Sequence, residues 1–220
     1  MGMNQRFVFS AGFTIMSQFV LLAGIGYGFD PAKLEQLQLT HPHRCEKCNL
    51  EGANAGGWEL DDSILTGANL KGASLVSTEF ESADLSGADL SNARMHMATF
   101  TRANLRKANL SGAILTSAAI NGANLGEADL SGADLRDSNL LGAKLNGARL
   151  EKTNLGNVNL RQTDLRRANL HKGSLVNADL READLTGADI RGADFRGAKL
   201  TGAIWSDGRK CRPDSVGVCK

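Results

Sequence analysis

Proline, aromatic residues and an excess of either charge are all scarce in this chain of 220 residues. It contains 3 prolines, 5% aromatic residues and a formal net charge of +1. A charge balance this even gives no general attraction toward nucleic acid or acidic partners. The 4 cysteines all lie near the two ends, and glycine, with 25 residues, is abundant. Long amphipathic helices are absent between residues 50 and 200, and this composition favours a solenoid.

A period of five residues runs through most of the sequence. Residues 83–93 read ADLSGADLSNA, and a large apolar residue, usually Leu, occupies 30 of the 31 multiples of five from 50 to 200. Two residues before each large residue lies a small one, usually Ala, and Asn or Asp often stands between them. A helix repeats every 3.6 residues and a strand every 2, so neither explains this period. Trp58, at a small site, is expected to fill the space left by Ala55, the one exception among the large sites.

The pattern itself has physical consequences. Two positions in five are restricted to apolar or small residues, so they are expected to point inward, whereas the other three accept charge and face water. Glycine, Asn and Asp at fixed offsets suit turns because they tolerate positive φ or bond their own backbone. No single coil of such a chain can bury its own core, so successive coils must stack on one another.

Tandem A(D/N)LXX units of this kind resemble the pentapeptide-repeat protein family. The resemblance covers residues 48–204 and implies an all-β fold, the right-handed quadrilateral β-helix, with four pentads in each coil. Thirty-one pentads would then form about 7.75 coils. It also implies that the large residue of each pentad and the Ala two positions earlier both face the core.

Residues 1–28 have the anatomy of a signal peptide. Arg6 precedes a stretch without charge from 7 to 29, and Gly26 and Gly28 are small residues placed for cleavage. We therefore expect export to the periplasm, the cell exterior or a thylakoid lumen. The alternative is a membrane anchor formed by residues 7–29, because this stretch is long enough to span a bilayer.

Both ends of the repeat region need caps, because an open solenoid end exposes unpaired backbone groups and core side chains. Residues 29–47 are expected to cap the first coil, with a short helix over residues 31–39 (PAKLEQLQL). Residues 205–220 are expected to form a cap loop at the other end, where Trp205 takes a large-site position and plugs the last coil.

The cysteines form two local pairs. In an exported protein an even number of terminal cysteines indicates disulfides, and we expect them to join Cys45 to Cys48 and Cys211 to Cys219. Cys48 falls on the small inward site of the first pentad, whereas Cys45 is expected just outside the repeat. The alternative is a zinc site, since zinc accepts the side chains of an HxHxCxxC cluster, His41, His43, Cys45 and Cys48. The lack of a second CxxC and the export signal favour the disulfides.

No catalytic constellation can be assembled from the sequence. The repeat carboxylates occupy turn positions with a structural role, and the two histidines of the repeat, His96 and His171, fall on different faces of a four-sided helix. No glycine-rich phosphate loop is present. We therefore expect no enzymatic activity, no cofactor and no catalytic or metal-binding residue.

Two surface groups remain as candidates for binding. Five carboxylates fall on two successive rungs of one face and form a candidate patch for a cation or a basic partner: Glu59, Asp61, Asp62, Glu79 and Glu81. The simpler alternative is a solvated surface that binds nothing. A modest apolar strip on another face consists of Val76, His96, Met97 and Ile114.

The function expected from these features is that of an exported, non-enzymatic scaffold or protein-binding module with an unknown protein partner. The alternative is the role of family members that mimic DNA, bind DNA gyrase and confer quinolone resistance. That role requires a strongly acidic rod, but residues 49–200 hold 19 acidic and 17 basic side chains, a net charge of −2. Nucleic acid is not expected as a partner, and the membrane is a partner only if residues 7–29 stay uncleaved. The sequence does not predict the oligomeric state.

Overall fold

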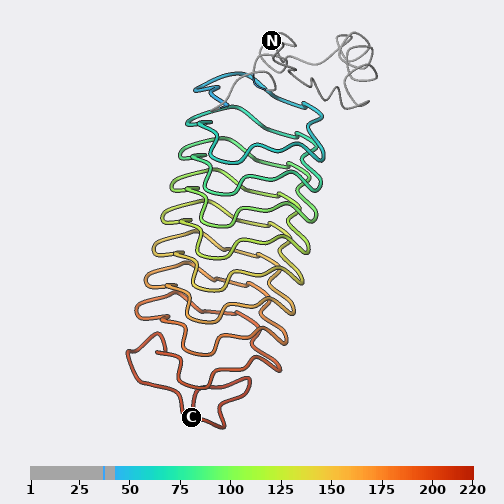
Figure 1. The fold of residues 1–220 in the computed structure, drawn as a ribbon. Coiled ribbons are helices and arrows are strands. Elements are labelled where there is room, and N and C mark those ends of the chain that lie inside the picture. Colours follow the sequence, from blue (N-terminus) through green and yellow to red (C-terminus); the bar gives the residue numbers. More distant parts are fainter. Residues whose placement is uncertain (1–36, 38–42) are drawn as a thin grey trace, which may run out of the picture.

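The described residues form a rod of stacked coils that runs from residue 43 at one end to the C-terminal segment at the other (Figure 1). The structure, a computed structural model, describes Leu37 and residues 43–220. Within this part, 29 parallel β-bridges join residues that are 20 positions apart, from Arg44↔Ile64 to Asp184↔Ile204. Four pentads therefore make one coil, as the family resemblance implies. The expected signal peptide or anchor lies outside the described residues.

Each pentad contributes one bridge residue rather than a longer strand. Among residues 43–220, parallel pairing consists of these single-residue bridges, stacked in four ladders, one on each side of the rod. The ladders begin at residue 44, so Cys45 takes the large inward position of a pentad. The expectation that Cys45 lies outside the repeat was therefore wrong. The sequence did indicate the inward position of Cys45, because this residue stands at a multiple of five, five residues before Leu50.

A hydrogen-bonded turn connects each pair of pentads. The N–H of Ala53, for example, donates to the carbonyl oxygen of Leu50 at 3.0 Å. The third residue of this turn has a positive φ, as a type II turn requires. Glycine adopts a positive φ there without strain, but Asp62 and Met97 have φ values of 54° and 58° at the same position. The stacked ladders hold these strained residues in place, because every turn is bonded to the next coil.

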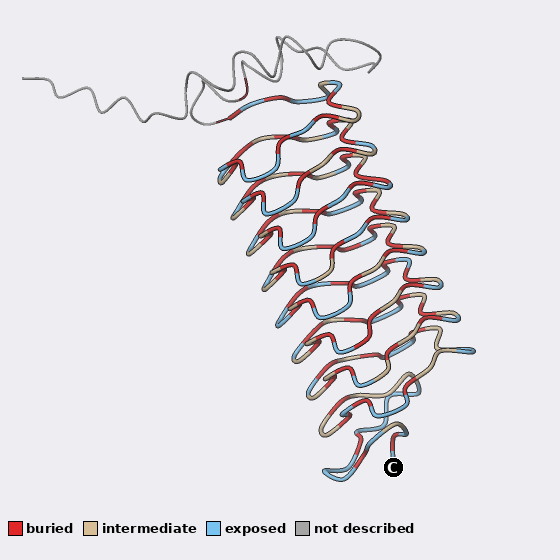
Figure 2. Ribbon diagram, turned by 90° about the vertical axis from the view of Figure 1, so that its right-hand side faces the viewer, coloured by how far each residue is buried: buried red, intermediate tan, exposed pale blue. Residues whose placement is uncertain are grey.

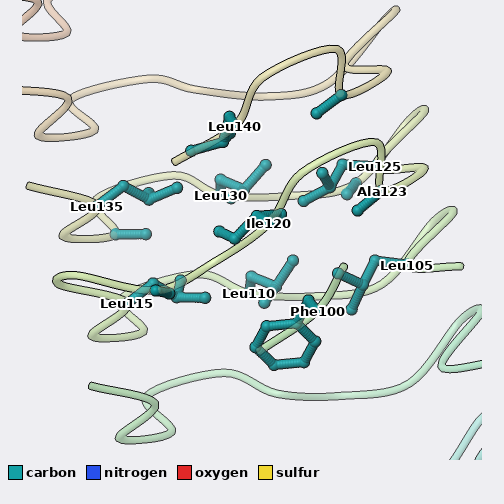
Figure 3. Packing of buried hydrophobic residues seen from close by; sticks show 14 of the residues in the cluster. Phe100, Leu105, Leu110, Leu115, Ile120, Ala123, Leu125, Leu130, Leu135 and Leu140 are labelled. Carbon is teal, nitrogen blue, oxygen red and sulfur yellow. The ribbon is translucent and has the colours of Figure 1, made fainter. Parts of the chain in front are cut away.

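The core is a continuous column of side chains along the rod axis. From residue 60 to residue 185 the large positions are 0–2% exposed, and the buried residues line the inside of every coil (Figure 2). Side chains of successive coils stack in register, as Leu110 does on Leu130 (Figure 3). Where a small site holds a hydroxyl, that group can bond the backbone: Thr78 Oγ1 donates to the carbonyl oxygen of Ala55 at 2.7 Å. The inward register expected from the sequence is confirmed.

The two ends are closed differently. At the first coil, Leu37 is helical, 1% exposed and part of the core, while the rest of the expected helix over residues 31–39 lies outside the described residues. At the last coil, Trp205 packs on Phe195 with ring centroids 5.0 Å apart, and the chain then reverses direction. Two antiparallel bridges, Ile204↔Lys210 and Lys199↔Val216, pair the final segment with the last coil.

Candidate partner-binding surfaces

The rod has four faces, which we number by the large residues at their centres. Face 1 is centred on residues 45, 65 and every twentieth residue to 205, face 2 on 50 to 190, face 3 on 55 to 195 and face 4 on 60 to 200. One pentad on one face is a rung. Successive rungs lie about 4.8 Å apart, the usual spacing between paired strands.

The five predicted carboxylates do lie together on the first rungs of face 4. Glu59 and Glu79 are bridge partners on adjacent coils. Asp61 Oδ1 accepts a hydrogen bond from the backbone N–H of Glu81 at 2.6 Å, and Glu81 forms an ion pair with Arg102 on the next coil. These two contacts offset part of the repulsion between stacked carboxylates. Among residues 43–220 no group of three or more acidic, His or Cys side chains is arranged to hold a metal ion.

Charge changes sign along the rod. Residues 49–93 hold eight acidic side chains and one basic one, a net charge of −7, whereas residues 94–200 hold 11 acidic and 16 basic side chains, a net charge of +5. The net charge of the whole repeat region is therefore close to zero, although residues 49–93 are acidic and residues 94–200 are basic. The candidate carboxylate patch belongs to this acidic end.

The predicted apolar strip lies on three successive rungs of face 3. Val76 is 36% exposed, Met97 57% and Ile114 42%. The other exposed large hydrophobic residues of the described part are Leu141 on face 4 and Val216 and Val218 in the C-terminal segment. Beside the strip, the ring Nδ1 of His96 is 2.7 Å from Thr116 Oγ1. The twelve outward positions of the first four rungs of this face, from residue 54 to residue 117, include one charged residue, Arg94. The strip thus lies in an area with few charges, although Ile114 has two charged bridge partners, Arg94 and Asp134.

Ion pairs within single rungs neutralise many charges of the basic part. In five rungs an Arg two residues after an Asp donates hydrogen bonds to that carboxylate: Asp134–Arg136, Asp164–Arg166, Asp179–Arg181, Asp189–Arg191 and Asp194–Arg196. These side-chain hydrogen bonds lower the pKa of each of the five carboxyl groups. These pairs were not predicted from the sequence, although the recurring D-x-R spacing places both side chains on the same outward edge.

The cysteine sulfur atoms lie at bonding distance in the two pairs expected from the sequence. The S–S distances are 2.15 Å for Cys45 and Cys48 and 2.03 Å for Cys211 and Cys219. Of the alternative zinc ligands, His43 is 4% exposed and its Nδ1 contacts the carbonyl oxygen of Leu37. His41 lies outside the described residues.

One shallow hollow lies on face 1, lined by Ser86, Gly87, Asn104, Arg106 and Lys107. Its two cations do not form a free anion site, because both form ion pairs with Glu127. The predicted separation of His96 and His171 is also present, since they belong to faces 3 and 2.

Comparison with known proteins agrees with this architecture. The family model for pentapeptide repeats matches, with 8 copies, in overlapping pieces that cover residues 44–81, 78–116, 113–151, 123–162, 143–181 and 163–202. The chain is a pentapeptide-repeat protein. A search of curated proteins found no significant match.

Solved structures of similar proteins support the assignment. HetL, a pentapeptide-repeat protein involved in heterocyst differentiation regulation in the cyanobacterium Nostoc sp. strain PCC 7120, is 31% identical, with a TM-score of 0.59 over 77% of this chain and 90% of HetL. A trypsin-treated variant of QnrB1, a plasmid-mediated fluoroquinolone resistance protein, is 20% identical, with a TM-score of 0.55 over 77% of this chain and 86% of that one. The second likeness concerns the fold alone. These relatives imply the right-handed quadrilateral β-helix for this pentapeptide-repeat protein.

Proposed function

We propose that this pentapeptide-repeat protein is a non-enzymatic, exported binding module that presents face 3 to a protein partner. The observation that carries the proposal is the strip of Val76, Met97 and Ile114, exposed at 36%, 57% and 42% on consecutive rungs. Exposed apolar side chains gathered on one face of a protein can mark an interaction site. Family membership supports the proposal, because pentapeptide-repeat proteins are generally structural or protein-binding modules.

The flatness of face 3 suits a protein rather than a small molecule. Small-molecule sites are usually concave and bury most of the ligand, whereas this area has short side chains on either side of the strip, among them Gly56, Ser77 and Ser117. Met97, the most exposed of the three, has an unbranched side chain that can adapt to an irregular partner surface.

A photo-crosslinking experiment tests this assignment. A crosslinking amino acid at Ser77, beside the strip, should capture a partner in cells that make the protein, and Met97→Asp in the same chain should abolish the captured band. Asn177→Asp is the matched control, because Asn177 occupies the same turn position on the same face with a φ of 59°, four coils further on. Capture that is equal with and without Met97→Asp would refute a partner site on face 3.

Export is the second part of the proposal and rests on the sequence of residues 1–28. Among the residues that the structure describes, no helix has the length and apolarity needed to cross a membrane. Cell fractionation with N-terminal sequencing of the native protein tests the proposal. A mature N-terminus near residue 29 outside the cytoplasm supports cleavage, an intact N-terminus in the membrane fraction supports the anchor, and an intact soluble cytoplasmic protein contradicts export.

The alternative of gyrase binding by DNA mimicry is not favoured by the charge distribution. DNA carries negative charge along its whole length, whereas this rod is acidic in residues 49–93 and basic beyond them. We expect no effect of the purified protein on DNA supercoiling by gyrase, and inhibition at a stoichiometric ratio would restore this alternative.

A further inference from the structure

The disulfide of the first coil is placed differently from the one in the C-terminal cap. Cys45 occupies the large inward site of one pentad and Cys48 the small inward site of the next, at the N-terminal end of the ladders. Cys45 is 7% exposed, and Cys48 is partly exposed. In contrast, Cys211 and Cys219 are 3% and 4% exposed. The first pair thus contains one partly exposed residue, Cys48, while both residues of the second pair are buried.

The first coil does not need the disulfide to keep its shape. The backbone at both cysteines is bonded to the second coil as in the coils that follow: Cys45 N–H donates to the Ile64 oxygen at 2.8 Å, and Asn69 N–H donates to the Cys48 oxygen at 2.9 Å. Elsewhere Leu and Ala fill these two positions without any covalent bond. The disulfide also joins residues only three positions apart. Because it closes such a short loop, it removes little conformational entropy from the unfolded chain and is expected to stabilise the fold only slightly.

Opening the bond would therefore leave two thiols held in place. The Cα atoms are 5.4 Å apart, a separation set by the turn and the ladder, so the reduced pair remains ready to close again. The two residues between the cysteines, Glu46 and Lys47, are exposed. Arg44 is exposed at the same edge and forms an ion pair with Glu46.

We propose that Cys45 and Cys48 form a thiol–disulfide exchange site whose substrates are protein dithiols. A substrate thiolate attacks the Sγ atom of Cys48, the more exposed residue of the pair, the Cys45–Cys48 bond breaks, and Cys45 leaves as a thiolate. The second substrate thiol, as its thiolate, then attacks the substrate sulfur of this mixed disulfide and releases Cys48 as a thiolate. The substrate is oxidised to a disulfide, and the cysteine pair gains two electrons and takes up the two protons that the substrate thiols lost.

The buried cap pair provides an internal control within the same chain. Exchange requires access of the attacking thiolate to a sulfur atom, and the enclosed Cys211 and Cys219 deny this access. The first-coil pair should therefore equilibrate with a thiol buffer under native conditions, and the cap pair should not. The proposal is independent of the partner-binding role of face 3.

Native redox titration tests the proposal. The full chain is incubated in glutathione buffers of graded potential, free thiols are alkylated, and each pair is assigned by mass spectrometry of peptides. We expect Cys45 and Cys48 to become reduced while Cys211 and Cys219 stay oxidised, with no change in circular dichroism. In the Cys45→Ser variant, oxidised glutathione should form a stable mixed disulfide on Cys48, whereas Cys48→Ser should give much less adduct on Cys45.

Catalytic turnover is the second measurement. Catalytic amounts of the oxidised protein should accelerate formation of a disulfide in a reduced dithiol peptide, with oxidised glutathione as the terminal oxidant, and Cys48→Ser should abolish the acceleration. The proposal fails if the two pairs are reduced together only as the protein unfolds, if the adduct prefers Cys45, or if the dithiol peptide is oxidised no faster than without protein. Binding of one zinc ion per reduced chain in place of exchange would also overturn it.

Discussion

Phe80 and Phe100 stack within the core on consecutive coils of face 4, with ring centroids 5.0 Å apart and ring planes 7° from parallel. Both side chains are fully buried. The pair shows how the solenoid is stabilised: each inward side chain packs mainly on the same position of the neighbouring coils. The stability of one coil therefore depends on the next, as expected for a repeat architecture.

Phe100→Ala should destabilise the protein by about 3–5 kcal/mol, because it leaves a cavity in a core that cannot collapse across the rigid ladders. Urea unfolding followed by circular dichroism measures the loss. Thr99→Ala, one residue earlier on an outward position, is the control and should change the stability by less than about 0.5 kcal/mol. Equal effects of the two substitutions would contradict the core position of Phe100.

The five-residue register predicts opposite tolerance at adjacent positions. Leu130 is 0% exposed, so Leu130→Asp should prevent folding, because it buries an unpaired charge. Ser131→Asp should be tolerated, since the equivalent outward position holds Glu51 and Glu151 on other coils of face 2. Arg136→Ala should likewise have little effect. The yield of soluble protein and its melting temperature distinguish the variants, and similar behaviour at 130 and 131 would rule out the register.

The Asp179–Arg181 pair predicts a pH dependence with a definite sign. The Arg181 side chain donates to the carboxylate at 2.8 and 2.5 Å and lowers the pKa of Asp179 below its usual value of 3.8. Because the folded-state pKa is lowered, the ionised carboxylate stabilises the fold above the unfolded-state pKa. This contribution is lost as the pH falls through the folded-state pKa. The effect is modest, since the arginine is exposed.

Titration by NMR should show the Asp179 pKa rising toward its ordinary value in Arg181→Gln, with less loss of stability below pH 4 than in the wild type. Arg161→Gln is the matched control, because Arg161 lies one coil below on face 4 and forms no ion pair within the described residues. If the pKa of Asp179 is the same in Arg181→Gln as in the wild type, the pairing is refuted.

The acidic patch predicts opposite effects for two glutamates two residues apart. Glu79 faces Glu59 on the adjacent coil and forms no ion pair within the described residues, so Glu79→Gln should raise the melting temperature slightly. Glu81 pairs with Arg102, so Glu81→Gln should lower it slightly. Both differences should shrink in high salt because the side chains are exposed.

A double variant, Asp61→Asn with Glu81→Gln, tests whether the patch binds a cation or a basic partner. A melting temperature that rises with added calcium in the wild type, and less so in Asp61→Asn with Glu81→Gln, would support a cation site. No response to calcium and an unchanged set of crosslinked partners in that double variant would leave the patch as a solvated surface.

The architecture was predictable because the period fixes which side of the chain each residue occupies. The face of every outward residue followed from its position within a cycle of 20 residues, so the acidic patch and the apolar strip were found from the sequence. Cys45 was misplaced because a cysteine at the large site, preceded by Arg44, does not resemble the repeat consensus.

The remaining contacts depend on chain geometry that no local pattern encodes. The cap loop was expected at residues 205–220, but its antiparallel return to Lys199 and Ile204 was not, because that pairing depends on where the last coil ends in space. Similarly, the bond from Glu81 N–H to Asp61 joins residues 20 positions apart and appears once the coils are stacked.

The single-residue ladders restrict how this protein can change length in evolution. Removing 20 residues would delete one coil and shorten the rod by about 4.8 Å. Every residue beyond the deletion would stay on the same face of the rod. Removing five residues would also preserve which side chains point inward, but it would turn the rest of the rod by a quarter of a revolution. A five-residue deletion between residues 82 and 93, for example, would move Met97 and Ile114 to a different face from Val76 and so divide the apolar strip, although no surface residue had been substituted.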